Sequence, residues 1–207
     1  MVFNVPIVSK LIFWPFEFLA NSIYKRADAI CAVSNTYCKR AKDVNHKVKD
    51  TTSVFIGTEL DVFDRYASEN QVMRKDDGEI WMAYCGTLGT SYNLPLVFEA
   101  MKKIHNPLLR FIVMGDGPLM EQFKSKAKGL NVTFTGRLDY SHMCGMLSAC
   151  DIVVNPIVGR SVATIINKHA DYAACGKPVL NTQKSEEYQI LVEKYRMGFN
   201  CITSDDV

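Results

Sequence analysis

From residue 79 onward, the chain alternates short apolar runs with longer amphipathic stretches. The apolar runs have the length of buried strands and lie at 80–85, 109–114, 132–135, 151–155, 178–181 and 198–201. The stretches between them predict helices at 94–104, 141–148, 167–175 and 186–194. A further helix is expected after the turn at 115–118 and ends at about residue 128. Near-continuous apolar strands joined by helices are typical of a parallel sheet that is covered on both faces. We therefore expect an α/β fold with an open, doubly wound sheet of Rossmann type, which binds ligands at the carboxyl ends of its strands.

The pattern before residue 79 is less regular. Residues 12–26 predict a helix, short strands are expected at 29–33 and 54–56, and Ser34 suits the N-cap of a further helix. The next residues have no clear apolar periodicity and end in a polar run with a glycine, which is typical of a linker. The predicted organisation is a remnant of one domain, a linker and a second domain, at 1–56, 57–78 and 79–207.

Composition narrows the classes of function. The chain has 24 Lys and Arg against 22 Asp and Glu, a net charge of +2, which is too balanced to indicate a nucleic-acid partner. Its seven cysteines are odd in number and include no C-x-x-C pair or zinc-ligand spacing. We therefore expect buried free thiols, a cytoplasmic protein and no metal site.

One N-terminal stretch resembles a membrane contact. Residues 11–20 are mostly apolar, but Pro15 and Glu17 interrupt them, and they are shorter than the ~20 residues that a spanning helix needs. The basic residues that follow are Lys25, Arg26, Lys39 and Arg40. The segment is compatible with peripheral association at the inner membrane surface, or with packing against further protein.

Three strand-to-helix loops are candidates for ligand contact. Gly86 and Thr87 follow the run at 80–85, where a glycine turn and a helix start attract anions. Gly115 and Gly117 follow the next run, and Arg137 follows the third, from which it can reach a phosphate or lie over a base. Each loop also has a plain interpretation as a turn or a solvated charge.

The richest loop opens the predicted helix at 167–175. Asn167, Lys168 and Asp171 are spaced three and four residues apart, which predicts a shared helix face. A cation and an amide beside a helix N-terminus suit a phosphate, and a carboxylate one turn later suits a ribose diol. The alternative is an ordinary surface Lys–Asp pair.

Several segments between residues 27 and 179 resemble, in order, the motifs of GT-B glycosyltransferases of family 4. They are ADAICAVS at 27–34, FIGTELDVF at 55–63, YCGTLG at 84–89, VMGDGP at 113–118, FTGRL at 134–138, ACDIVVNP at 149–156 and KHADYAACGKPV at 168–179. The last is similar to the K-x-x-E-Y-x-A-x-G-K-P-V form of one branch of that family.

The resemblance implies transfer of a sugar from a nucleotide-diphosphate donor to an acceptor hydroxyl, with retention and without a metal or other cofactor. The acceptor would be a carbohydrate or a lipid-linked molecule in polysaccharide or glycolipid assembly. Residues 79–207 would form the donor domain, truncated at its C-terminus, and residues 1–56 the tail of the acceptor domain. The resemblance implies donor contacts at Gly86, Thr87, Arg137, Asn167, Lys168 and Asp171, whereas no catalytic residue is identified.

The sequence also departs from the family pattern. Many members have two glutamates in an E-x7-E motif, whose places are taken here by Ala163 and Asp171. Thr87 and Tyr92 stand where many members place an arginine and a lysine against the diphosphate, so Lys168 is the candidate for the missing charge. Two alternatives stay open: a sugar-nucleotide epimerase, which shares the two-domain fold, and a nucleotide-sugar-binding subunit that needs a partner chain.

Overall fold

The computed structural model describes residues 6–73, 78–158, 164–201, 203 and 206–207. The chain divides into two compact units, Met1–Phe55 and Ile56–Val207. Among the described residues, no helix is long and apolar enough to cross a membrane.

The first unit is a small α/β assembly. Its elements are the helices α1 (Pro6–Arg26) and α2 (Asn35–Val44) and the parallel strands β1 (Ala29–Ala32) and β2 (Asp50–Ser53). Ser34 caps α2 as predicted, because its side chain accepts a hydrogen bond from the Tyr37 amide. The strand expected at 54–56 lies earlier in the chain, at β2. Backbone pairing with β1 sets its position, and its Asp-Thr-Thr-Ser sequence has no apolar signal.

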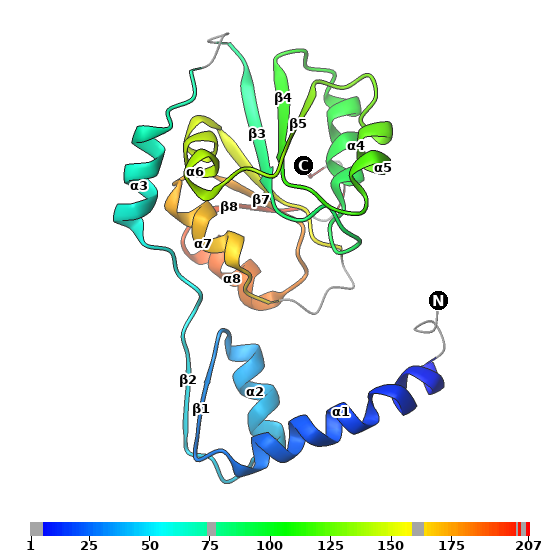
Figure 1. Cartoon of the computed structure of the whole chain (residues 1–207), viewed down its shortest axis with the longest axis vertical. Helices are drawn as coiled ribbons and strands as arrows, with labels where there is room; N and C mark the ends of the chain where they lie inside the picture. Colours follow the sequence, from blue (N-terminus) through cyan, green and yellow to red (C-terminus); the bar gives the residue numbers. More distant parts are fainter. Residues whose placement is uncertain (1–5, 74–77, 159–163, 202, 204–205) are drawn as a thin grey trace. The chain divides into compact units, whose positions relative to one another are not determined.

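The second unit contains a six-stranded parallel sheet. Its strands are β3 (Ile80–Cys85), β4 (Leu109–Met114), β5 (Val132–Gly136), β6 (Ile152–Asn155), β7 (Val179–Asn181) and β8 (Gly198–Asn200). They lie in the order β5-β4-β3-β6-β7-β8 (Figure 1). The chain builds outward from β3 in one direction and returns to continue on its other side, so the predicted doubly wound fold is confirmed.

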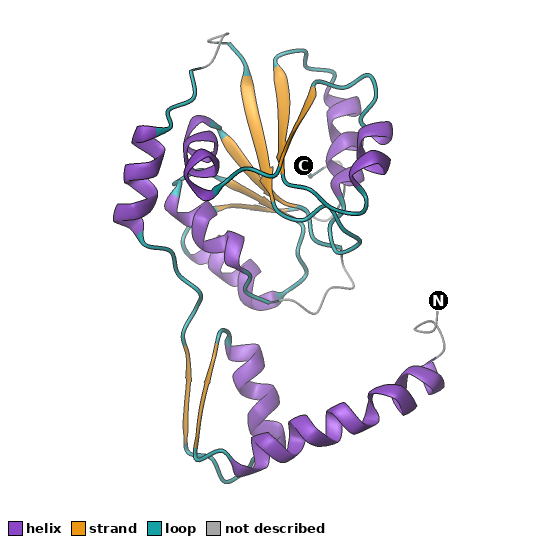
Figure 2. Ribbon diagram, in the orientation of Figure 1, coloured by secondary structure: helices purple, strands orange, loops and turns teal. Residues whose placement is uncertain are grey.

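Helices cover both faces of this sheet (Figure 2). On one face, α4 (Leu94–Ile104) and α5 (Met120–Lys126) pack on Met82 and Tyr84 of β3. On the other face, Ala83 and Cys85 pack with residues of α6 (Tyr140–Ala149), α7 (Asn167–Ala174) and α8 (Glu186–Lys194). Alternate residues of one strand thus enter two cores, which explains why the strand is apolar throughout.

One helix lies where the sequence predicted a linker. Helix α3 (Leu60–Glu69) occupies much of the stretch 57–78 and lies beside α6 (Figure 1). Phe63 of α3 is 1% exposed and belongs to the core that α6 shares. A Cβ at Gly145 of α6 would clash with the Asn70 carbonyl, so the helices approach closely there. The interpretation of 57–78 as a linker without clear apolar periodicity missed this helix, in which Phe63, Tyr66 and Ala67 recur at helical spacing and pack in one core.

Candidate functional site

The site lies where the sheet reverses its strand order, between β3 and β6. Pairing between these strands ends at Ala83 and Val153. Beyond it, the buried Tyr172 hydroxyl of α7 accepts a hydrogen bond from the Cys85 amide at 3.1 Å and donates one to the Val154 carbonyl at 3.0 Å. The tyrosine replaces the missing backbone pairing. Farther on, the loops after the two strands meet again, because the Asn93 amide donates to the Pro156 carbonyl and the Val158 amide to the Ser91 carbonyl.

Glycines allow the loops after β3 and β4 to touch. Gly115 has a φ of 144°, and a Cβ at this position would clash with the Gly86 carbonyl. A Cβ at Gly117 would lie 2.5 Å from the Leu88 carbonyl oxygen. Backbone therefore packs on backbone at the carboxyl ends of the two strands. Both positions require glycine because a Cβ would clash with the neighbouring loop.

A cleft of about 720 Å³ opens at these strand ends. It is lined by Cys85, Gly86, Thr87, Met114, Gly115, Asp116, Gly117, Arg137, Leu138 and Met143. Three of the predicted donor contacts, Gly86, Thr87 and Arg137, are therefore in one cavity. The Thr87 and Arg137 side chains are exposed and so are accessible to a ligand.

Lys168 lies in a separate, buried position. It is 8% exposed, and among the described residues its Nζ has no hydrogen-bond partner. Nζ lies 4.1 Å from the ring centre of Tyr84 and 3.9 Å from that of Tyr92. Burial lowers the pKa of Lys168 to about 7, whereas two aromatic faces at this range favour the ammonium form. Among the described residues, the amine therefore has aromatic rings beside it and no hydrogen-bonded counter-ion.

Asn167 and Asp171 line a second cavity, of about 460 Å³. Asp171 Oδ1 accepts a hydrogen bond of 2.9 Å from the Tyr140 hydroxyl, and the Thr58 hydroxyl lies 2.7 Å from the same tyrosine oxygen. Partial burial is the main cause that raises the pKa of Asp171. The prediction that Lys168 shares a helix face with these two residues is wrong, because its side chain turns toward β3.

The neighbouring strands β6, β7 and β8 each end in an asparagine. Asn155, Asn181 and Asn200 are register partners, and Nδ2 of each of the first two donates to Oδ1 of the next, at 2.9 Å and 2.8 Å. Asn155 Nδ2 also lies 3.1 Å from Nε2 of His169, whose ring stacks on Tyr188 at 3.5 Å. Burial lowers the pKa of His169 to about 3, so this histidine is neutral beside Lys168.

Sequence reasoning missed the aromatic surroundings of the site. Tyr84 was expected as a strand residue, and Tyr92 was noted only for standing in the place of a cation. Tyr140 lies just before the helix expected at 141–148 and was assigned no role. The available signal was that all three lie within or just after strands that end at the site. Ala163, which takes the first glutamate place of the family pattern, lies outside the described residues.

Comparison with known proteins places the chain in a family. Residues 79–206 match the model of the family described as glycosyl transferases group 1. A GDP-mannose-dependent alpha-(1-6)-phosphatidylinositol dimannoside mannosyltransferase of Mycobacterium tuberculosis is 23% identical over 147 residues, 69% of this chain and 38% of that protein. A probable glycosyltransferase, WbjE of Pseudomonas aeruginosa, is 24% identical over 200 residues, 91% of this chain and 49% of that protein.

Solved structures agree on the fold. HepE of Anabaena in complex with UDP superimposes with a TM-score of 0.72 at 17% identity, covering 91% of this chain and 54% of that one. WaaG, a glycosyltransferase involved in lipopolysaccharide biosynthesis, gives a TM-score of 0.61 at 15% identity over 97% of this chain and 59% of that one. The chain thus spans only 38% to 59% of the length of these four proteins. Because the family model covers well over half of the chain, the protein belongs to the glycosyl transferases group 1 family.

Proposed function

We propose that the chain binds the donor of a glycosyltransferase that moves a sugar from a nucleoside diphosphate to an acceptor hydroxyl, with retention and without a metal. The observation that carries the proposal is the cleft at the ends of β3, β4 and β5, with Gly86 on its wall and the Lys168 cation behind that glycine. A positive charge beside a departing diphosphate stabilises the negative charge that develops on it. The known complexes of a structural neighbour support a nucleotide sugar as ligand, since HepE was solved with UDP and with UDP-glucose.

Within this proposal, each residue has a distinct role. The Thr87 amide would bind the diphosphate, and Gly86, whose own amide donates to the Met114 carbonyl, would allow its close approach. Arg137 would contact the base or a phosphate. Asp171 would accept hydrogen bonds from the ribose hydroxyls, beside its present partner Tyr140. Asn167, exposed at the start of α7, would assist at the phosphates.

Donor binding can be measured by calorimetry with UDP-glucose, GDP-mannose and ADP-glucose. At least one should bind, and we expect Lys168→Met to weaken it by at least ~10-fold, because a charged partner of a phosphate contributes about 1.5–3 kcal/mol. Asp171→Asn should weaken it several-fold. Lys194→Met is the matched control, because Lys194 also lies over a tyrosine ring, at 5.1 Å from the centre of Tyr195, but on α8 and far in sequence from the site.

Unchanged affinity in both Lys168→Met and Asp171→Asn would refute the site. Turnover is followed separately, by release of the nucleoside diphosphate with and without a supplied N-terminal domain. Binding without turnover in both cases would favour a binding subunit, and conversion of the bound sugar to its epimer would favour an epimerase.

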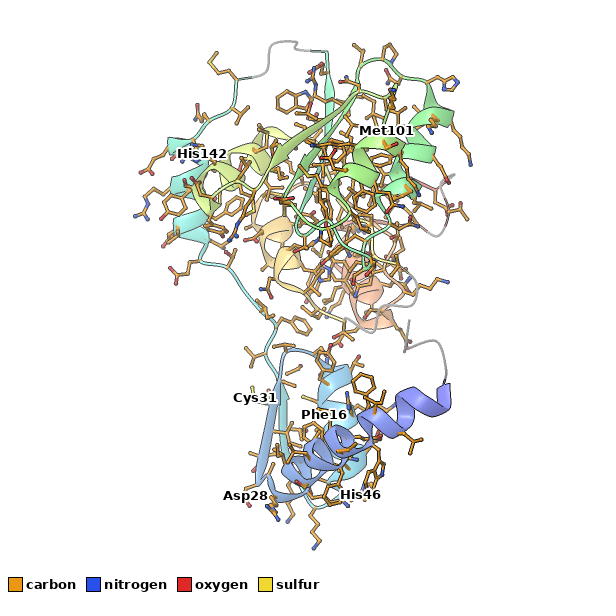
Figure 3. The ribbon with its side chains drawn as sticks, turned by 45° about the vertical axis from the view of Figure 1, so that its right-hand side comes forward. Phe16, Asp28, Cys31, His46, Met101 and His142 are labelled. Carbon is orange, nitrogen blue, oxygen red and sulfur yellow. The ribbon has the colours of Figure 1, made fainter. Side chains whose placement is uncertain are left out.

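We further propose that α1 contacts a membrane surface during assembly of a polysaccharide or glycolipid, at the cytoplasmic face of the inner membrane. Its apolar side chains are largely exposed, as for Phe16 at 67% (Figure 3). The helix ends in Lys25 and Arg26, which suit anionic lipid headgroups. Such a position would favour a lipid-linked acceptor, in line with the dimannoside named for the mycobacterial relative.

Vesicle flotation tests this contact. The chain should float with vesicles that contain anionic lipid, and Trp14→Ser with Phe18→Ser should reduce the bound fraction several-fold, because each removes a large exposed apolar group. Phe199→Ser is the control, since Phe199 is 69% exposed but lies on β8. No flotation of the unmodified chain, or an equal loss with Phe199→Ser, would contradict the proposal and favour packing of α1 on protein.

A further inference from the structure

The buried lysine has an unusual set of neighbours. Lys168 Nζ faces the rings of Tyr84 from β3 and Tyr92 from the following loop, whose centres are 5.5 Å apart. Among the described residues, it has neither a hydrogen-bond partner nor an ion pair. A primary amine that is buried without an acceptor is easily deprotonated, because the low-dielectric surroundings penalise its charged form.

The titratable groups around this amine are neutral. Cys85 is the charge partner that most affects Lys168, but burial raises the pKa of this thiol to about 11. Burial likewise raises the pKa values of Tyr84 and Tyr92, and on α7 the pKa of His169 is lowered to about 3. The nearest carboxylate on the same helix, Asp171, is hydrogen-bonded to Tyr140. Among the described residues, two aromatic faces therefore favour a charge on Lys168, but no anion is bonded to it.

The amine nevertheless lies directly behind the cleft. A Cβ added to Gly86 would lie 2.9 Å from Lys168 Nζ and 3.0 Å from the Tyr84 hydroxyl, so the amine packs against the glycine that lines the cavity. An anion on the cavity side of Gly86 would act on the amine at short range and through little solvent. A nearby negative charge favours the protonated form of a lysine.

We propose that Lys168 takes up a proton when a nucleotide diphosphate sugar enters the cleft beside Gly86, so that donor binding is coupled to protonation of this side chain. The inference rests on the proposed donor-binding function and adds that the affinity for the donor depends on pH. The proton comes from solvent, and no covalent bond to the donor forms or breaks in this step.

The sign of the pH dependence follows. Burial lowers the pKa of Lys168 to about 7 in the ligand-free chain, and the diphosphate would raise it in the complex. Affinity is then highest below pH 7, where the lysine is already protonated, and it falls as the pH rises above 7. The fall continues until the pH reaches the pKa of the complex, with a limiting slope of one tenfold loss per pH unit for one coupled proton.

Calorimetry with UDP-glucose and GDP-mannose between pH 6 and 9 tests the coupling. These diesters have no phosphate group that titrates in this range, and their uracil and guanine rings lose a proton only towards pH 9. Below about pH 8, the ligand itself therefore takes up no proton. Titration in two buffers with different ionisation enthalpies gives the number of protons bound. We expect uptake that approaches one proton between pH 7 and 9 and a loss of affinity of about tenfold or more across that interval.

Two variants and one direct measurement separate the outcomes. Lys168→Met should abolish proton uptake, and Lys168→Arg, which stays charged throughout, should bind with no pH dependence in this range. NMR titration of the Lys168 Cε resonance in the unmodified chain, without and with donor, should show a higher pKa in the complex, a result that does not depend on the folding of a variant.

The two proposals fail differently. If no nucleotide sugar binds at any pH, the donor-binding function is wrong. If a donor binds with constant affinity and without proton uptake, or if Lys168→Met retains the uptake, the function stands and the coupling to Lys168 is overturned.

Discussion

Gly115→Ala should lower the free energy of unfolding of the second unit by about 3 kcal/mol or more, with loss of donor binding. The new Cβ would meet the Gly86 carbonyl, and the residue would have to keep a φ of 144°. Both contacting groups are backbone at the ends of paired strands, so neither can move without disturbing the β3–β4 ladder. Urea denaturation followed by circular dichroism measures the change.

Gly129→Ala is the matched control for this experiment. Gly129 also has a positive φ, of 83°, but a Cβ there would have no neighbour within 4 Å. It should therefore show only the conformational cost of about 1–2 kcal/mol for an alanine in that region. If the two variants were equally destabilised, close contact between the loops would not be what requires glycine at 115.

Tyr172→Phe should lower the free energy of unfolding by about 2–4 kcal/mol, because two buried backbone groups would lose their partner. The hydroxyl serves the Cys85 amide and the Val154 carbonyl, and phenylalanine offers neither an acceptor nor a donor. Chemical denaturation of the variant and the unmodified chain under the same conditions provides the comparison.

Tyr188→Phe provides the control for that change. Tyr188 is also 1% exposed, but among the described residues its hydroxyl has no hydrogen-bond partner. Removal of an unsatisfied buried hydroxyl should be neutral or slightly stabilising. Equal destabilisation of the two variants would mean that the Tyr172 hydroxyl does not hold β3 and β6 together.

The sheet was predictable because its signal is local. Strands β3, β4 and β6 are mostly apolar runs bounded by turn residues, and the expected ranges for β3, β4 and α4 match the observed ones. Helix α3 was missed although Phe63, Tyr66 and Ala67 recur at helical spacing, because this apolar face is short and part of the packing is against the small Gly145 of α6. Such close approach depends on the partner helix and leaves little pattern in its own sequence.

The candidate site was predictable in part. That Gly86, Thr87 and Arg137 share one cleft follows from the rule that parallel strands present their carboxyl ends together. The side of α7 on which Lys168 lies did not follow from spacing. Helical spacing placed it with Asp171, whereas the rings of Tyr84 and Tyr92 draw its long side chain toward the sheet. This contact depends on residues more than 70 positions away in the chain.

The hydrogen-bonded asparagines at the ends of β6, β7 and β8 affect which alignment of these strands is stable. β7 and β8 have only three residues each, and strands so short can pair with their neighbours in more than one alignment. A shift by one residue would separate Asn181 from both of its partners and leave amide groups without hydrogen bonds in the interior. The polar side chains thus discriminate against misaligned sheets, a selection that the apolar residues of these strands could not make by themselves.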